Sequence, residues 1–226
     1  MEGYRQGVRD VVPIFPLSYV LLPGAPLPLH IFERRYRRLL TDIEAGEHPA
    51  GFGVVALTNG TETSRNQQFA MIGTMAEILE REPYPDGSCD LLTVGSRRFE
   101  IRSVDRTSKP YLQATVRWFG EPVGDLSPGL VATARQLCSA YIRTLNAISG
   151  RRSAGELAAD ALRLSYEIAG RLQLTCADRQ DLLAVPTAAE RLCAGLRLLR
   201  REITLLQSTR TVPVAPQALR LIPSPS

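Results

Sequence analysis

Apolar and polar residues alternate with a period of two along much of the first half of the chain. In LQATVRW, residues 112–118, Leu, Ala, Val and Trp share one face, while Gln, Thr and Arg share the other. RRFEIRS, residues 97–103, shows the same alternation, which is typical of a strand with one buried face. Apolar runs at residues 51–58, 73–80 and 89–94 predict three further strands.

Short turn signals join these predicted strands. The Pro-Asp-Gly sequence at residues 85–87 connects two of the apolar runs, because proline and glycine supply the backbone angles that a turn needs. Gly95-Ser96 separates the next two runs and predicts a tight two-residue hairpin with positive φ at Gly95. Five or more short antiparallel strands, together with one helix, predict a compact barrel or a strongly curled sheet.

The one helix of this half is predicted to begin inside PGAPLPLHIFERRYRRLL, residues 23–40. Pro28 and the extended residues before it set the entry into the helix, and an apolar stripe then runs from Ile31 to Ile43. Gly46 is expected to end the helix.

Two polar residues near the start of this helix have predicted structural roles. Glu33 is placed in the first turn, where a carboxylate favours the helix dipole, and is expected to pair with Arg37 four residues later. His30 is expected to hydrogen-bond the backbone at the point where the strand becomes the helix.

From about residue 127 the hydrophobic period becomes helical. The predicted helices open with capping signals, which are Ser127-Pro128, Ser153 with Glu156, Thr175 with Asp178, and Thr187 with Glu190. Apolar residues then recur every three or four positions, for example from Leu157 to Leu172 and from Leu192 to Leu206. This half therefore predicts a small helical bundle. After Gln207, four prolines without periodicity indicate a tail with little structure of its own.

Composition excludes several classes of chemistry. The 27 basic residues include a single lysine, Lys109, which lies in Ser-Lys-Pro and not in the Gly-Lys-Ser/Thr of a Walker A loop. Two histidines and four separated cysteines show no zinc-like spacing, and no GxSxG or GxGxxG motif occurs. No catalytic residue, metal or cofactor is therefore expected, and the cysteines are expected to be free thiols. The clustered Glu77, Glu80 and Glu82 are interpreted as a solvated strand face.

Charge and hydropathy give no sign of a membrane, and little of nucleic acid. The net charge of +4 is small, whereas phosphate binding normally needs a concentrated basic face. No run of about 18 apolar residues occurs and the N-terminus lacks the layout of a signal peptide, so a cytoplasmic location is expected. The strongest basic patch contains Arg34, Arg35 and Arg38, which form either an anion or partner contact or a solvated helix face.

The order of these pieces resembles a known family. FPLSYVLLPGAPLPLHIFERRYRRLL, residues 15–40, resembles the entry motif of the Lon N-terminal domain family, the PUA-like module that precedes the ATPase in Lon proteases. Residues 72–101 are similar to the next strands of that family and contain its apolar-Gly-x-Arg-Arg-Phe segment, here with Gly95, Arg98 and Phe99.

The resemblance continues to the end of the helical half. YLQATVRW is similar to the strand that closes the family's barrel, and residues 171–206 are similar to its helical subdomain and long exit helix. The likeness covers about residues 11–206.

This resemblance, together with the residue patterns described above for the tail, predicts an α+β fold in three parts. A PUA-like curled β-barrel with one helix is expected at residues 1–122, an α-helical bundle at 123–207, and a flexible Pro-rich tail at 208–226. The residues expected to form the structural motif are Pro28, His30, Glu33, Gly95, Arg98 and Phe99.

The resemblance also implies protein recognition, because in Lon this module is associated with capturing protein substrates and organising the oligomer. The expected function is a non-enzymatic polypeptide-recognition module, an adaptor or modulator in proteolysis or protein quality control. Its expected partners are unfolded or client proteins, with a protease or chaperone among the candidates, and a homo-oligomer is left open. Neither the ATPase nor the protease domain of Lon is represented in the 226 residues.

The segment SYVLLPGAPLP is rigid and apolar, and is expected to supply an exposed patch for polypeptide. The residues expected to contact polypeptide are Tyr19, Leu21, Leu22, Pro23, Pro26 and Phe32. The alternative is that these side chains simply close the barrel.

Two other functions stay open. PUA-like barrels include RNA binders, and a face from Arg34 to Arg38 that meets phosphates would give binding that weakens steeply with salt. The third hypothesis is an enzyme of unfamiliar type, for which the sequence supplies no constellation of catalytic residues.

Overall fold

The structure is a computed structural model that describes residues 10–59, 68–150 and 156–209. Its contacts divide the chain into two compact units, residues 1–119 and 120–226. This division lies close to the boundary predicted after residue 122. The predicted tail at 208–226 lies outside the described residues, except for its first two positions, which belong to the last helix.

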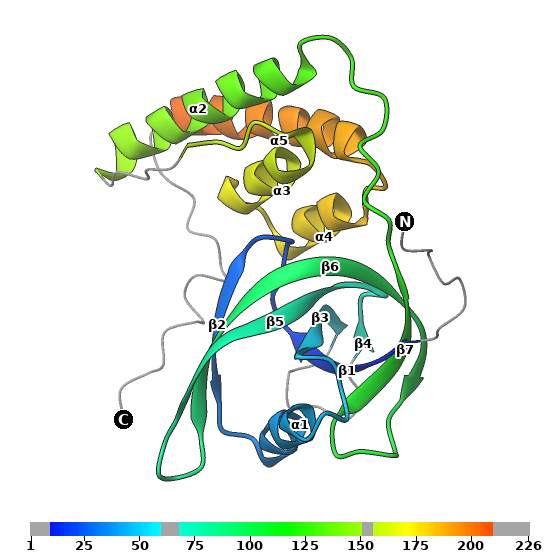
Figure 1. The fold of residues 1–226 in the computed structure, drawn as a ribbon. Coiled ribbons are helices and arrows are strands. Elements are labelled where there is room, and N and C mark those ends of the chain that lie inside the picture. The colour runs from blue at the N-terminus through cyan, green and yellow to red at the C-terminus, as the bar shows by residue number, and fades with distance from the viewer. Residues whose placement is uncertain (1–9, 60–67, 151–155, 210–226) are drawn as a thin grey trace. The chain divides into compact units, whose positions relative to one another are not determined.

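Unit 1, residues 1–119, is built from a sheet and one helix. Its described strands are β1 (Asp10–Leu17), β2 (Pro26–Ile31), β3 (Gly51–Asn59), β4 (Gln68–Phe69), β5 (Ile72–Pro83), β6 (Cys89–Asp105) and β7 (Leu112–Trp118), and the helix is α1 (Arg34–Glu44). The strands are ordered β1-β7-β6-β5-β3, and β1 also pairs in parallel with β3, so these five strands close into a ring (Figure 1). Strand β2 pairs with β6 outside this ring, and β4 pairs with β3. The predicted curled barrel with one helix is confirmed.

Two apolar clusters fill unit 1, and they follow from the alternation in the sequence. The first apolar cluster lies where α1 meets the sheet, and its buried residues are Phe15, Leu17, Leu21, Leu27, Ile31, Tyr36, Leu39, Leu40, Phe52, Val54, Ala76, Cys89, Leu91 and Tyr111. The ring of Phe15 stacks on that of Tyr36 with centroids 3.8 Å apart, which fixes α1 against β1. The second apolar cluster contains the inward residues of β6 and β7, including Phe99, Ile101, Ala114 and Val116.

Gly95 has a different role from the predicted one. Strand β6 runs without interruption through 17 residues, so the predicted hairpin at Gly95-Ser96 is wrong. Instead, Gly24 N donates to Gly95 O at 2.7 Å and Gly95 N donates to Ala25 O at 2.9 Å. A β-carbon on Gly95 would lie 2.3 Å from the Leu22 carbonyl oxygen. Glycine is required here because another stretch of backbone crosses β6 at contact distance.

The turn that does join two strands is at residues 84–88. Tyr84 N donates to Ser88 O and Gly87 N donates to Tyr84 O, while Gly87 has φ of +81°. These hydrogen bonds confirm the turn predicted at residues 85–87. Glycine suits position 87 because it adopts the left-handed conformation without steric cost.

The start of α1 differs from the prediction. The helix begins at Arg34, and Glu33 precedes it with extended angles of φ −68° and ψ 135°. Since Glu33 is outside the helix, its carboxylate accepts from Arg35 Nε at 2.9 Å and does not form the predicted pair with Arg37. Arg37 Nη1 instead donates to Asp86 O in the β5–β6 turn at 3.0 Å. Gly46, at φ +78°, follows the last turn as expected.

Arg98 was predicted on the polar face of its strand, opposite Phe99, but both side chains are completely buried. The Arg98 guanidinium lies 4.9 Å from the centre of the Phe119 ring. The sheet is therefore covered on both faces at this point, and the simple alternation of exposed and buried residues fails there.

Unit 2, residues 120–226, is helical in its described part, as predicted. Its helices are α2 (Leu130–Ser149), α3 (Ala161–Arg171), α4 (Cys176–Ala184) and α5 (Ala188–Thr209). The caps of the last two helices are confirmed: Thr175 Oγ1 accepts from Asp178 N at 3.1 Å, and Thr187 and Glu190 bond each other's backbone N–H groups.

The starts of α2 and α3 were predicted too early. Helix α2 begins after Gly129, whose φ is +78°, rather than at Ser127-Pro128. Helix α3 begins at Ala161 and is capped by Asp160, which accepts from Arg163 N at 2.8 Å. Ser153, the predicted cap, lies outside the described residues.

A buried arginine joins three helices of unit 2. Arg191 on α5 is 1% exposed, and it donates to Leu182 O, Ser165 Oγ and Val185 O at 3.2, 3.0 and 2.9 Å. Its guanidinium also lies 4.0 Å from the centre of the Tyr166 ring. These bonds satisfy the buried charge and hold the α4–α5 connection against α3.

We expect Gly95→Ala to destabilise unit 1 by about 1–3 kcal/mol, because the added methyl group has no space beside the Leu22 carbonyl. Urea unfolding followed by the fluorescence of Trp118, the single tryptophan, measures this change. Gly120→Ala is the control, since a β-carbon there meets no atom within 4 Å. Equal unfolding midpoints for the two variants would contradict the assigned role of Gly95.

Candidate binding surface

The residues predicted to bind polypeptide divide into a buried and an exposed group. Leu21 and Leu22 are 1% and 0% exposed, so they belong to the core and are not available to a client. Thr74 Oγ1 donates to Leu21 O at 2.7 Å, which anchors this stretch on β5. The prediction that these two leucines contact polypeptide is wrong, because the backbone that follows them packs directly against β6 at Gly95. The alternative interpretation, that they close the barrel, holds for them.

The other four predicted residues keep some contact with solvent. Tyr19 is half-buried and packs against the first apolar cluster, and Pro23 is half-buried as well. Pro26 is exposed on β2, and Phe32 is 60% exposed immediately after that strand. An exposed phenylalanine contributes nothing to the core, so it is the strongest of the predicted contacts.

Phe32 lies in a group of exposed rings that the sequence did not predict. Its ring centroid is 6.1 Å from that of His30, which in turn is 6.2 Å from that of Tyr84. Asp90 joins the group, since its carboxylate lies 2.6 Å from His30 Nδ1 and accepts from Tyr84 Oη at 2.9 Å. His30 therefore binds a side chain across the β2–β6 pair, and the predicted bond to the backbone is wrong.

Electrostatics match this arrangement. The hydrogen bonds from His30 and then Tyr84 lower the pKa of Asp90, and the bond to Asp90 raises the pKa of Tyr84. The aspartate is therefore charged at neutral pH, and it holds the rings of His30 and Tyr84 together.

The strands bearing these rings have a side that faces away from the first apolar cluster. We call this side of β2, of β6 at residues 89–94 and of β5 at residues 77–83 the outer face. Pro26, Pro28 and His30 lie opposite Val94, Leu92 and Asp90 in register, and the prolines are exposed while Leu92 and Val94 are half-buried. Leu79 adds a side chain that is 58% exposed at the bulge between Ile78 and Glu80.

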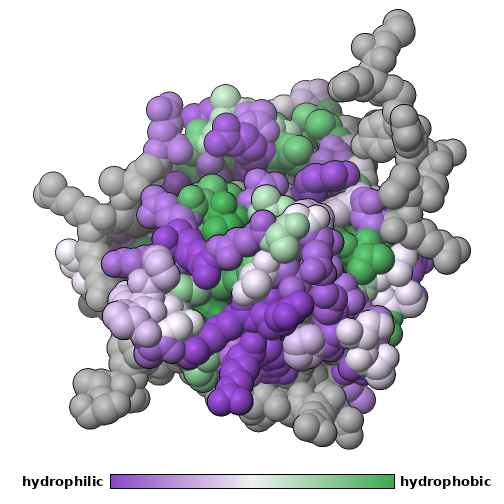
Figure 2. Space-filling view, turned by 60° about the horizontal axis from the view of Figure 1, so that its bottom comes forward, coloured by the Kyte–Doolittle hydropathy of each residue, from purple (hydrophilic) through white to green (hydrophobic). Residues whose placement is uncertain are grey.

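The predicted basic patch is largely engaged within the protein. Arg35 pairs with Glu33 and lies 4.5 Å from the centre of the Tyr36 ring, and Arg38 Nε lies 2.7 Å from Asp42 Oδ1. Arg37 donates to the β5–β6 turn, as described above, whereas Arg34 is exposed. Figure 2 shows a face on which hydrophilic residues cross the middle and hydrophobic ones appear in separate areas.

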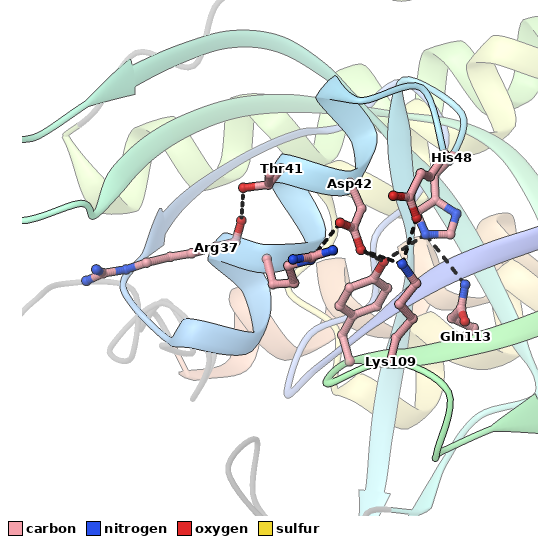
Figure 3. Close-up of polar contacts among 9 residues, drawn as sticks. Arg37, Thr41, Asp42, His48, Lys109 and Gln113 are labelled. Atoms are coloured by element: carbon pink, nitrogen blue, oxygen red, sulfur yellow. Dashed lines mark hydrogen bonds and ion pairs between the residues drawn. The ribbon is translucent and has the colours of Figure 1, made fainter.

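A polar network at the C-terminal half of α1 was also missed by the sequence analysis (Figure 3). Asp42 is 1% exposed and accepts from Tyr111 Oη at 2.6 Å, from Lys109 Nζ at 3.0 Å and from Arg38. Lys109 also pairs with Glu47 at 2.6 Å, and His48 Nε2 lies 2.8 Å from Tyr111 Oη. The available signal was the position of an aspartate next to the apolar stripe of the helix.

The pKa shifts in this network fit an ionised carboxylate on Asp42 that accepts from three donors. Burial raises the pKa of Asp42, but the bonds from Tyr111 and Lys109 and the charges of Arg38 and Lys109 outweigh burial and bring it below its usual value. Burial, with the bond to Asp42, raises the pKa of the Tyr111 hydroxyl far above its usual value. Burial lowers the pKa of His48. The Asp42 carboxylate, which accepts from three donors, and the neutral Tyr111 hydroxyl therefore attach α1 to the connection between β6 and β7.

No resident metal or membrane element is found in the part of the chain that the structure describes. Within residues 10–59, 68–150 and 156–209, no three His, Cys, Asp or Glu side chains gather closely enough to hold a metal ion. Among these same residues, every helix is too short or too polar to cross a bilayer. All four cysteines are free thiols, of which Cys89 and Cys138 are buried.

Comparison with protein families identifies the domain. Residues 11–201 match the model of the ATP-dependent protease La (LON) substrate-binding domain. The chain belongs to this family. The Lon proteases of Cytophaga hutchinsonii and Escherichia coli K12 are each 27% identical, over 218 and 220 residues, covering 93% and 90% of this chain and 26% of either relative. The chain thus spans about a quarter of the length of these relatives, and no protease domain is matched within it.

Solved structures agree with this assignment. The Lon N-terminal domain protein from Xanthomonas campestris is 27% identical with a TM-score of 0.64, and the match covers 83% of this chain and 98% of that one. The N-terminal domain of Mycobacterium avium complex Lon protease has the same fold, at 20% identity and a TM-score of 0.60, over 84% and 98% of the two chains. The resemblance and the α+β fold inferred from the sequence are therefore confirmed.

We expect Asp42→Asn to lower the stability of the LON substrate-binding domain by about 1–3 kcal/mol at pH 7, because it weakens hydrogen bonds to charged partners. The folded pKa of Asp42 lies below the ordinary value near 4, so its contribution is fully present above that pH and is lost as the pH falls through the folded pKa. Urea unfolding at pH 7 and at pH 3 measures both effects.

Glu44→Gln is the control for this experiment, since Glu44 lies on the same helix and forms an exposed pair with Arg81. We expect it to change the stability by less than about 1 kcal/mol at either pH. A wild-type advantage over Asp42→Asn that is as large at pH 3 as at pH 7 would refute the ionised role of Asp42.

Proposed function

We propose that this LON substrate-binding domain is a non-catalytic polypeptide-recognition module in the cytoplasm, which binds unfolded or partner proteins as an adaptor or modulator in proteolysis or protein quality control. The observation that carries the proposal is the exposure of Phe32, Leu79 and Tyr84 around the outer face of unit 1. Exposed apolar side chains that form a contiguous patch, unlike single exposed ones, are typical of a surface that binds a partner.

The family membership supports the same conclusion, since the matched family is described as a substrate-binding domain. The solved relative from Mycobacterium avium complex is itself part of a Lon protease. A substrate-binding domain contributes to proteolysis by holding a client, and the outer face would provide apolar contacts for such a client.

The arrangement of the basic residues favours polypeptide over RNA. Arg35, Arg37 and Arg38 donate to groups of unit 1, so phosphate binding would have to break existing bonds. Stacking of bases also needs aromatic rings beside the basic face, and the exposed rings lie instead beside the carboxylate of Asp90.

We expect the wild-type domain to bind an unfolded apolar peptide, and the binding to persist when salt is raised. The probe is a fluorescein-labelled peptide of 20 residues without net charge, rich in Leu and Phe and interrupted by Pro and Gly. Fluorescence anisotropy at 50 and 300 mM NaCl measures its affinity, and a labelled single-stranded RNA is titrated in parallel. Binding of the RNA alone, lost at the higher salt, would replace the proposal with RNA recognition.

We expect Phe32→Ala to weaken binding of this peptide by at least about fivefold, because truncation of an aromatic contact removes a large apolar area. Met71→Ala is the matched control, since Met71 is 51% exposed in the same unit and outside the outer face. The proposed site is wrong if the two variants bind the peptide equally well.

A further inference from the structure

The outer face carries an unbalanced row of acidic residues beside its apolar residues. The β2–β6–β5 pairing sets His30, Asp90 and Glu82 side by side, then Pro28, Leu92 and Glu80, and then Pro26, Val94 and Glu77. Each of the three rungs therefore ends in a glutamate on β5. Glu77, Glu80 and Glu82 are all exposed.

These glutamates have no basic neighbour that neutralises them. Within the residues that the structure describes, no Arg, Lys or His nitrogen forms an ion pair with any of the three. Arg81 lies between two of them in sequence, but it is opposite the buried Leu91 and pairs with Glu44 of α1. The arginine is thus turned away from the outer face by the alternation of the strand.

The apolar part of the face lies within reach of this row. Neighbouring strands are about 4.8 Å apart, so the central residues Leu92 and Val94 lie one strand from the glutamates. Leu79, which is exposed at the bulge, lies next to Glu80 in sequence. A side chain with a long apolar stem and a cationic end can lie over the apolar residues and place its charge at the carboxylates.

We propose that the outer face selects extended polypeptide segments in which apolar residues are flanked by Arg or Lys, over segments flanked by Asp or Glu. This inference rests on the proposed function and names the class of client. Carboxylates about two residues apart along a strand match basic residues with the same spacing in an extended client. The charge of the face also opposes two other occupants, since a second copy would bring glutamates against glutamates and RNA would bring phosphates against them.

The test compares three versions of the neutral probe peptide, which are the peptide itself, one with two added arginines at each end, and one with two added glutamates at each end. We expect the arginine version to bind the wild-type domain about tenfold more tightly than the glutamate version at 50 mM NaCl. The ratio is expected to fall to about threefold or less at 300 mM NaCl, because exposed charges are screened.

Two double variants locate the effect. Glu80→Gln/Glu82→Gln is expected to bind the arginine and glutamate peptides within about twofold of each other. Asp125→Asn/Glu156→Gln removes the same charge from exposed positions in unit 2 and is expected to keep the wild-type preference. Circular dichroism and unfolding midpoints confirm that both variants are folded.

The outcomes separate this inference from the proposed function. Equal binding of all three peptides by the wild type would overturn the charge preference and leave polypeptide recognition intact. Failure to bind any of them would overturn both. A preference that survives Glu80→Gln/Glu82→Gln would also overturn the inference, as would a dimer in light scattering that Phe32→Ala dissociates, since a second copy would then be the occupant.

Discussion

The close contact between the Leu22–Ala25 backbone and Gly95 is the constraint on which the rest of unit 1 depends. Backbone hydrogen bonds in both directions hold the crossing segment against β6. As a result Leu21 and Leu22 enter the core, β2 is aligned on β6, and the chain leaves β2 in the direction that starts α1. A side chain at Gly95 would push these two layers apart, so the missing β-carbon permits the close approach of residues 22–25 to β6.

The proposed binding surface, the outer face, consists of strand residues that this packing leaves exposed. Inward residues of β2, β5 and β6 are used by α1, whose far end is held by Asp42, Lys109 and Tyr111. The residues of the outer face lie on the opposite side of the same strands, whose backbone is held by the hydrogen bonds of the sheet. Binding to a surface of this kind costs little backbone conformational entropy, because hydrogen bonds between the strands already fix the backbone.

Local patterns in the sequence predicted those features that depend on local interactions. The alternation in 112–118, the turn at 85–87 and the caps at Thr175 and Thr187 are examples. The failures involve contacts between distant segments. The sequence around Gly95 is typical of a turn, but the backbone partners of Gly95 are Gly24 and Ala25, about 70 residues earlier in the chain, and no local pattern shows this.

The candidate site was predicted in part for the same reason. Phe32 was identified because it lies in a motif that resembles a family, whereas Tyr84 and Asp90 contact its neighbour His30 only through the pairing of β2 with β6. Leu21 and Leu22 were assigned to the surface because a proline-rich segment looks irregular in sequence. Its burial depends on the backbone crossing at Gly95, and that crossing is a property of the fold.

The prolines of β2 have a consequence for self-association. The carbonyl group of Ala25 accepts from Gly95 on β6. The backbone groups of alternate residues in an antiparallel strand lie on opposite edges of the strand. Those of Pro26, Pro28 and His30 are therefore expected at the edge of β2 that faces away from β6. Two of these three positions lack an N–H group, so an incoming strand finds few donors at this edge. A domain with exposed apolar side chains beside a sheet edge would otherwise be prone to form intermolecular sheets. The prolines allow it to display such side chains without becoming a template for aggregation.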